Sequence, residues 1–267
     1  MVWLRTMLTV LLLALPAGTA AAYELPNPQA LQVLLAMPPA TVTVVEPHLS
    51  SADKPVRVGY RGWPARTVLG RLFGPGWREA GLEITFRALD GYVSRIPVER
   101  FGEFEAHLVF ARADGDVFQL DNRLQNEKRV PLAPYYLVWN NVAAPELLSE
   151  GASYWPYQVA RIELSHGKRE ALLPGDLADR FAAEAAHLQR ECLACHKVNG
   201  HGGDKMPIDL VEVVGTMPAD AFRTWLLDPR SVMENSTMPA LAPGLPAAER
   251  QTLADRLHTY LAALAAR

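Results

Sequence analysis

The sequence contains very little cysteine, because only Cys192 and Cys195 occur among its 267 residues. Two cysteines cannot build a framework of several disulfide bonds, so the chain has room for a single thiol-based site. It also lacks an excess of either charge, since 26 Lys and Arg face 29 Asp and Glu. A chain so close to neutral has no basic surplus to attract nucleic acid or anionic lipid, and we expect neither as a partner.

Long apolar runs are equally scarce, and only the first segment of the chain carries one. Residues 1–22 contain one cation, Arg5, then an apolar run from Met7 to Leu15 and small residues that end at Ala22. This order is typical of a secretory signal peptide, and the run is too short for a membrane anchor, which needs about 20 apolar residues. We predict cleavage after Ala22 and an exported, soluble, periplasmic protein without a membrane span.

The remaining composition is that of a globular protein, with 49% hydrophobic and 21% charged residues. From Tyr23 to about Ser165, short runs alternate apolar and polar residues between turn residues, a pattern typical of half-buried strands. We expect strands at 82–88, 107–111, 129–132, 136–139 and 157–164, and one helix at 64–73.

After a short charged segment at 165–175, the pattern becomes helical. Helices are expected from the N-cap Asp176 to about Glu191, and over 219–227 and 247–265. The sequence therefore predicts an α+β protein in three parts: a signal peptide at 1–22, a β-rich domain at 23–168 and an all-α domain at 169–267.

Both cysteines belong to one pentapeptide, Cys192-Leu-Ala-Cys195-His196. On a helical turn, residues three and four apart share a face, so two thiols and an imidazole point toward one ligand. Thiols at this spacing can form thioethers with the vinyl groups of a haem, and the neutral histidine can bind its iron. The sequence predicts one covalently attached haem c, held by Cys192 and Cys195, with His196 as an axial ligand.

Three other kinds of site use cysteines at this spacing. A thioredoxin-like pair begins a helix after a strand, whereas a long amphipathic stretch precedes Cys192. A zinc site needs four ligands, and only His201 and His258 follow as strong nitrogen donors. A disulfide between residues three apart would be strained. We therefore favour covalent haem.

An electron-carrying haem also needs a sixth ligand. Met206 lies ten residues after His196, too near to cross to the opposite face of the ring. Met238 lies in a segment stiffened by two following prolines, and histidine–methionine ligation raises the reduction potential. We predict Met238 as the second axial ligand rather than a residue that fills a core gap, with His201 and His258 as alternatives.

Four further segments accompany the pentapeptide: 203–210, 222–229, 238–240 and 257–261. Together they resemble class I cytochrome c over about residues 176–267. The resemblance implies that the Pro207 carbonyl accepts a hydrogen bond from Nδ1 of His196 and so orients the ring. It also implies that the first and last helices of this domain cross, with Leu188 against Tyr260. Alanines stand where the family often has glycine at the crossing, at 182, 183, 185 and 186.

The first domain shows a weaker resemblance, carried by segments 56–60, 86–97, 134–139 and 154–164. These look like the molybdopterin-binding fold of the sulfite oxidase type. Catalytic members bind molybdenum through a cysteine thiolate, which this domain lacks, so we expect a scaffold or docking surface instead. Residues 90–92 are expected to form a turn, and His48, His107 and His166 to lie at the surface.

The function expected from these features is single-electron transfer between periplasmic redox partners, by a mono-haem c-type cytochrome rather than an enzyme. Its partner would be a periplasmic redox enzyme or another cytochrome. A second hypothesis is an oxidoreductase whose first domain binds a pterin or another small molecule and passes electrons to the haem. A third is a haem-based sensor or assembly factor with an open sixth site.

Overall fold

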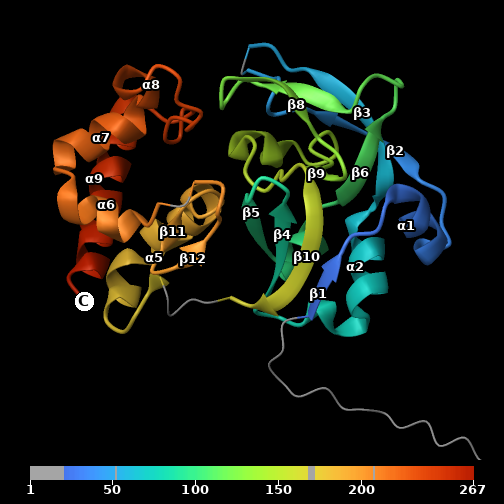
Figure 1. Cartoon of the computed structure of the whole chain (residues 1–267), viewed down its shortest axis with the longest axis horizontal. Coiled ribbons are helices and arrows are strands. Elements are labelled where there is room, and N and C mark those ends of the chain that lie inside the picture. Colours follow the sequence, from blue (N-terminus) through green and yellow to red (C-terminus); the bar gives the residue numbers. More distant parts are fainter. Residues whose placement is uncertain (1–20, 52, 168–171, 207) are drawn as a thin grey trace, which may run out of the picture.

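The computed structural model describes residues 21–51, 53–167, 172–206 and 208–267 (Figure 1). Most of the predicted signal peptide, and Pro207, lie outside the described residues. Sheets occupy residues 21–166, which we call the β-rich region, and helices dominate residues 177–265, the helical region. The predicted α+β fold class is confirmed.

Two antiparallel sheets of four strands build the β-rich region. The first has the order β1 (Ala21–Glu24), β10 (Val159–His166), β4 (Leu82–Ala88) and β5 (Val93–Pro97). The second has the order β2 (Ala40–Val45), β3 (Arg57–Pro64), β6 (Ala106–Arg112) and β9 (Tyr136–Trp139). A separate hairpin joins β7 (Gln119–Asn122) to β8 (Glu127–Pro131).

One apolar core lies between these sheets and three helices, α1 (Pro28–Leu35), α2 (Ala65–Phe73) and α3 (Val98–Glu103). Alternation explains β4, because Leu82, Ile84 and Phe86 point into this core. Helical spacing explains α2, whose Val68, Leu69 and Leu72 are buried on one face. The five predicted strands and this helix are confirmed, with ends shifted by one or two residues.

The predicted cleavage after Ala22 would shorten β1. Ala21 and Ala22 pair with Leu164 and Glu163 of β10, so this cleavage would leave two of the four residues of the strand.

A buried carboxylate is the main polar feature of this core. Glu46 accepts hydrogen bonds from the hydroxyls of Tyr60 (2.7 Å) and Tyr136 (2.9 Å) and contacts Nδ1 of His48 (2.8 Å). Burial alone would raise the pKa of Glu46, but the hydrogen bonds and charge of His48, together with Tyr60, hold it below its ordinary value of 4.5. His48 and His107 are buried, so their predicted surface position is wrong, whereas His166 is exposed.

We expect Glu46→Gln to lower the free energy of unfolding at pH 7 by about 3 kcal/mol, because it breaks a buried charged network. The carboxylate stabilises the fold above pH 4.5, and this contribution is lost as the pH falls through the lowered pKa of the folded state. Urea unfolding at several pH values measures both effects. Glu105→Gln is a matched control, since Glu105 contacts His107 at 3.0 Å with a half-exposed side chain, and it should cost about 1 kcal/mol or less. Equal losses for the two variants would contradict the interpretation.

The helical region has a core of its own. Its elements are α5 (Leu177–His187), a π-helical turn (Leu188–Cys192), the short hairpin β11 (Lys197–Val198) and β12 (His201–Gly202), α6 (Leu210–Thr216), α7 (Ala219–Leu227), α8 (Pro229–Val232) and α9 (Ala247–Ala265). The bounds predicted for α7 and α9 are confirmed. The prediction of one continuous helix as far as Glu191 is wrong, because the last turn before the cysteines is π-helical.

The packing of α5 against α9 follows the expected crossing in part. Leu188 and Tyr260 lie in the same core, and the rings of Phe181 and Tyr260 are 5.4 Å apart. Among the four alanines of α5 considered above, only Ala185 is buried. Asp176 does not cap α5 with its side chain, which instead pairs with Arg267 at the end of the chain.

In the described ranges, none of the helices combines the length and the apolar character that crossing a bilayer would need.

Candidate functional site

The pentapeptide Cys192–His196 closes the π-helical turn that follows α5. The amides of Cys195 and His196 both donate to the Cys192 carbonyl, at 3.1 and 2.9 Å. Leu193 and Ala194, between the cysteines, are buried, whereas both cysteines and His196 remain half-exposed. The turn therefore directs its two apolar residues inward and leaves its three reactive side chains only partly exposed, and both cysteines are unpaired.

A glycine-rich loop holds this turn in place. The Gly203 amide donates to the carbonyls of Leu193 (2.9 Å) and His196 (3.0 Å), and the Met206 amide donates to the Cys195 carbonyl (2.9 Å). A Cβ atom on Gly203 would lie 2.2 Å from the oxygen of Ala194, so no larger residue fits there without movement of the backbone. The loop thus fixes the backbone on which the reactive side chains stand.

The protonation states suit a covalent haem. Burial raises the pKa of Cys192 to about 12 and that of Cys195 to about 11, so both remain thiols at neutral pH. Burial lowers the pKa of His196, which keeps the imidazole neutral as metal coordination requires. Nδ1 of His196 is buried and has no hydrogen-bond partner in the described part of the chain.

The alternative of a single metal ion finds no support in the geometry. Within the described ranges, no three His, Cys, Asp or Glu side chains are placed so that they could hold one ion together. The two thiols and the imidazole share a turn without converging on one point. This arrangement fits a wide planar ligand better than zinc, which draws four ligands to about 2.0–2.3 Å.

Met238 lies on the loop between α8 and α9, where it is half-buried against the core that Cys192 also contacts. Its amide donates to the hydroxyl of the buried Ser236 at 3.2 Å. Beyond it, Arg250 of α9 donates to the carbonyls of Leu241 and Leu227, each at 2.8 Å. Hydrogen bonds thus hold the loop on both sides of Met238.

Other methionines and histidines that follow the pentapeptide differ in their exposure. Met206 is 44% exposed, and Met217 packs at the edge of the core. His201 is half-buried in β12. His258 is half-buried, with its ring 5.4 Å from that of Phe222 and Nε2 buried without a hydrogen-bond partner in the described ranges.

The β-rich region contacts the pentapeptide directly. The Val93 amide donates to the Ala194 carbonyl at 2.8 Å, and the Asp204 amide donates to the Gly91 carbonyl at 2.9 Å. Figure 1 shows β11 and β12, which flank this loop, on the side of the helical region that faces β5. The expected turn at 90–92 is confirmed, because Asp90 accepts from the Tyr92 amide and Gly91 has a φ of 86°. Its contact with the pentapeptide was not predicted.

Side chains strengthen this interface. The side-chain contacts that cross it include those of Lys205 with Asp90 (2.9 Å), Gln189 with Glu83 (2.7 Å) and Ser153 with Glu191 (2.7 Å). The β-rich region therefore supports the turn that carries the cysteines at several points.

The chain matches no known family model and no curated protein. A function for it therefore has to come from its residues and their arrangement.

We expect Gly91→Ala to loosen the contact between the two regions. An added Cβ would lie 2.9 Å from backbone atoms of Asp204 and Lys205. Gly115→Ala is a matched control, because Gly115 has nearly the same φ, 82° against 86°, but open space around it. Both variants should lose about 1–2 kcal/mol through backbone strain. Only Gly91→Ala should also speed the proteolytic separation of the two regions, by about tenfold if the lost contacts cost a further 1.4 kcal/mol. Equal cleavage rates in the two variants would contradict this role.

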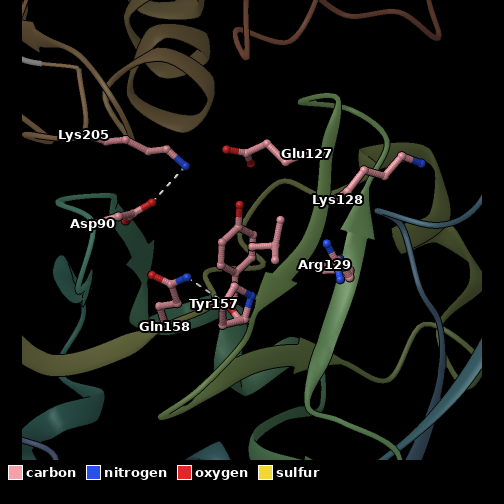
Figure 2. A pocket seen from close by; sticks show the side chains of 9 residues that line it. Asp90, Glu127, Lys128, Arg129, Tyr157, Gln158 and Lys205 are labelled. Carbon is pink, nitrogen blue, oxygen red and sulfur yellow. Dashed lines mark hydrogen bonds and ion pairs between the residues drawn. The ribbon is translucent and has the colours of Figure 1, made fainter.

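A shallow cavity of about 540 Å³ that is wide open to solvent lies beside the same loop, and most of the residues that line it are polar or charged. Its walls are β8, the segment that carries Tyr157 and Gln158, the turn at Asp90, and Lys205 of the helical region (Figure 2). The volume falls within the range of small-molecule sites, about 300–1,000 Å³. This cavity could not be predicted from the sequence, because its walls come from segments far apart in the chain.

Proposed function

We propose that this protein is an exported mono-haem c-type cytochrome that transfers single electrons between periplasmic redox partners. The observation that carries the proposal is the turn at Cys192–His196. It carries two unpaired thiols and a neutral imidazole that are partly exposed, while the residues between the cysteines are buried. A haem bound there would supply reversible exchange of one electron at its iron.

In this proposal, Cys192 and Cys195 hold the ring through thioethers, and His196 and Met238 are the axial ligands. The hydrogen bonds of Gly203 and Met206 keep the histidine side of the site in a fixed geometry. Arg250 and Ser236 do the same for the loop of Met238. Ligands that stay in place in both oxidation states keep the reorganisation on electron transfer small, which suits a carrier.

The β-rich region acts in this proposal as a scaffold that supports the haem turn and as a docking surface for a redox partner. Its backbone and side-chain contacts to residues 189–205 support the first role. Molybdenum chemistry of the sulfite oxidase type does not fit, because this region contains no cysteine to bind the metal.

Expression of the full chain, signal segment included, in a bacterium that matures c-type cytochromes tests the proposal. We expect a coloured periplasmic protein that keeps one haem under denaturing conditions and titrates as a one-electron couple. A colourless protein at the mass of the bare polypeptide would overturn the proposal. Identification of the redox enzyme that co-purifies from the native periplasm would then name the partner.

The second candidate function is an oxidoreductase in which the β-rich region binds a small molecule and passes its electrons to the haem. The cavity beside Lys205 favours it, because a ligand there would lie next to the loop that holds the cysteines. Metal analysis separates a pterin enzyme from a carrier, since molybdenum in the purified protein supports the former and iron alone the latter.

A further inference from the structure

Two charged side chains that line the cavity, those of Glu127 and Arg129, make no hydrogen bond or close ion pair in the described part of the chain. The Glu127 oxygen Oε2 is buried and accepts no hydrogen bond within the described part of the chain. The Arg129 guanidinium makes no side-chain hydrogen bond or ion pair among the same residues, although the backbone amide of Arg129 donates to Asp121 at 2.9 Å. Leaving a buried acceptor without a donor costs about 1–3 kcal/mol, so the fold holds Glu127 there at a cost.

The other charged side chains that line the cavity form ion pairs with neighbouring residues. Lys205 pairs with Asp90 at 2.9 Å and lies over the ring of Tyr157, 5.9 Å from its centre. Lys128 pairs with Asp121 at 3.1 Å, and Figure 2 shows its side chain directed away from the other lining residues. Glu127 and Arg129, both on β8, therefore remain without a hydrogen-bonded partner for their side chains, although Glu127 acts through its charge on Lys205 and Arg129 on Asp121.

The backbone of the cavity wall is strained at two of these positions. Arg129 has a φ of 51° and Gln158 a φ of 56°, in the left-handed region that favours glycine. Such a conformation costs about 1–2 kcal/mol for each residue, and such residues cluster at ligand sites. Local hydrogen bonds hold both in place, because Asp121 accepts from the Arg129 amide and the Leu132 carbonyl accepts from the Gln158 amide at 3.0 Å.

We propose that the cavity binds a small zwitterion of the amino-acid type. Its carboxylate would pair with the Arg129 guanidinium, whose planar fork matches a carboxylate in two hydrogen bonds. Its ammonium group would supply the donor that Oε2 of Glu127 lacks. Because Glu127 lacks a donor and Arg129 lacks an acceptor, a ligand that carries both signs finds a hydrogen-bonding partner at both ends, whereas a simple anion or cation finds one only.

This site does not depend on the haem, since all of its proposed ligand contacts come from the β-rich region. Lys205 links it to the helical region, because the same loop that carries this lysine also holds Cys195 through the Met206 amide. An occupied cavity would therefore lie against the loop beneath the cysteines.

Isothermal titration calorimetry of the full chain tests the proposal, with each of the twenty standard amino acids as probe. We expect at least one to bind, and its analogues that lack the ammonium or the carboxylate group to bind about tenfold more weakly, as the loss of one charged hydrogen bond predicts. Glu127→Gln and Arg129→Met should each weaken binding by about the same factor. Lys128→Met is the matched control and should leave the affinity unchanged.

The proposal would be overturned if none of the twenty amino acids released heat on titration. Unchanged affinity in both Glu127→Gln and Arg129→Met would also overturn it. Equal binding of the analogue without an ammonium group would show a plain anion site and would also overturn it. The heat of binding does not depend on the absorption or the reduction potential of a haem. Failure of this proposal can therefore be distinguished from failure of the proposed haem attachment.

Discussion

Replacement of both Cys192 and Cys195 with alanine is expected to yield a protein without covalent haem and with a largely unfolded helical region. The helical core is small, and burial of several hundred Å² of haem surface at about 25 cal/mol per Å² would contribute on the order of 10 kcal/mol. Mass spectrometry under denaturing conditions measures attachment, and far-ultraviolet circular dichroism during heating measures the helices. Each single alanine variant should keep one thioether and an intermediate stability.

His201→Ala is the control for this experiment. His201 lies in β12, five residues beyond His196, and outside the pentapeptide. Its variant should attach haem with the same yield and show the same absorption spectrum as the unaltered protein. Covalent haem in the double alanine variant would contradict the assignment of the thiols, and a spectrum changed by His201→Ala would favour bis-histidine ligation.

The second large effect is expected from Met238→Ala. Loss of the thioether should lower the reduction potential, because histidine–methionine ligation raises it, and should open the iron to carbon monoxide. Axial ligation sets haem potentials over a range of about 0.8 V, so the fall should be the largest among the methionine variants. Redox titration and absorption spectra with carbon monoxide measure both results.

Met206→Ala and Met233→Ala provide controls, because both residues follow the pentapeptide and are 44% and 55% exposed. Neither should change the potential or the response to carbon monoxide. An unchanged potential in Met238→Ala would refute its role as ligand. Binding of carbon monoxide by the unaltered reduced protein would instead indicate an open sixth site, as the sensor hypothesis requires.

Periodicity along the chain predicted the regular elements well. The bounds of α7 and α9 follow from apolar spacing and from the prolines that precede or end them. The strands follow from alternation, as in β4. These signals are local, because each depends only on which face of one element is buried.

Features that depend on distant partners could not be predicted in this way. His48 is buried because Glu46 and Tyr136 hydrogen-bond to it, and Tyr136 lies 88 residues away. The π-helical turn before Cys192 and the pairing of Val93 with Ala194 likewise depend on tertiary packing. Of the candidate site, the pentapeptide was evident from residue types alone, whereas the cavity was not, since its walls meet only in the folded chain.

The bond between Val93 and Ala194 has a consequence for the order of maturation. In the folded chain, the backbone in the middle of the pentapeptide is occupied by the other region. If Cys192 and Cys195 carry a haem, as proposed, an enzyme that attaches it would have to bind this peptide while its backbone is free. We therefore expect the thiols to be modified first, and the β-rich region to pack against the helical region only afterwards.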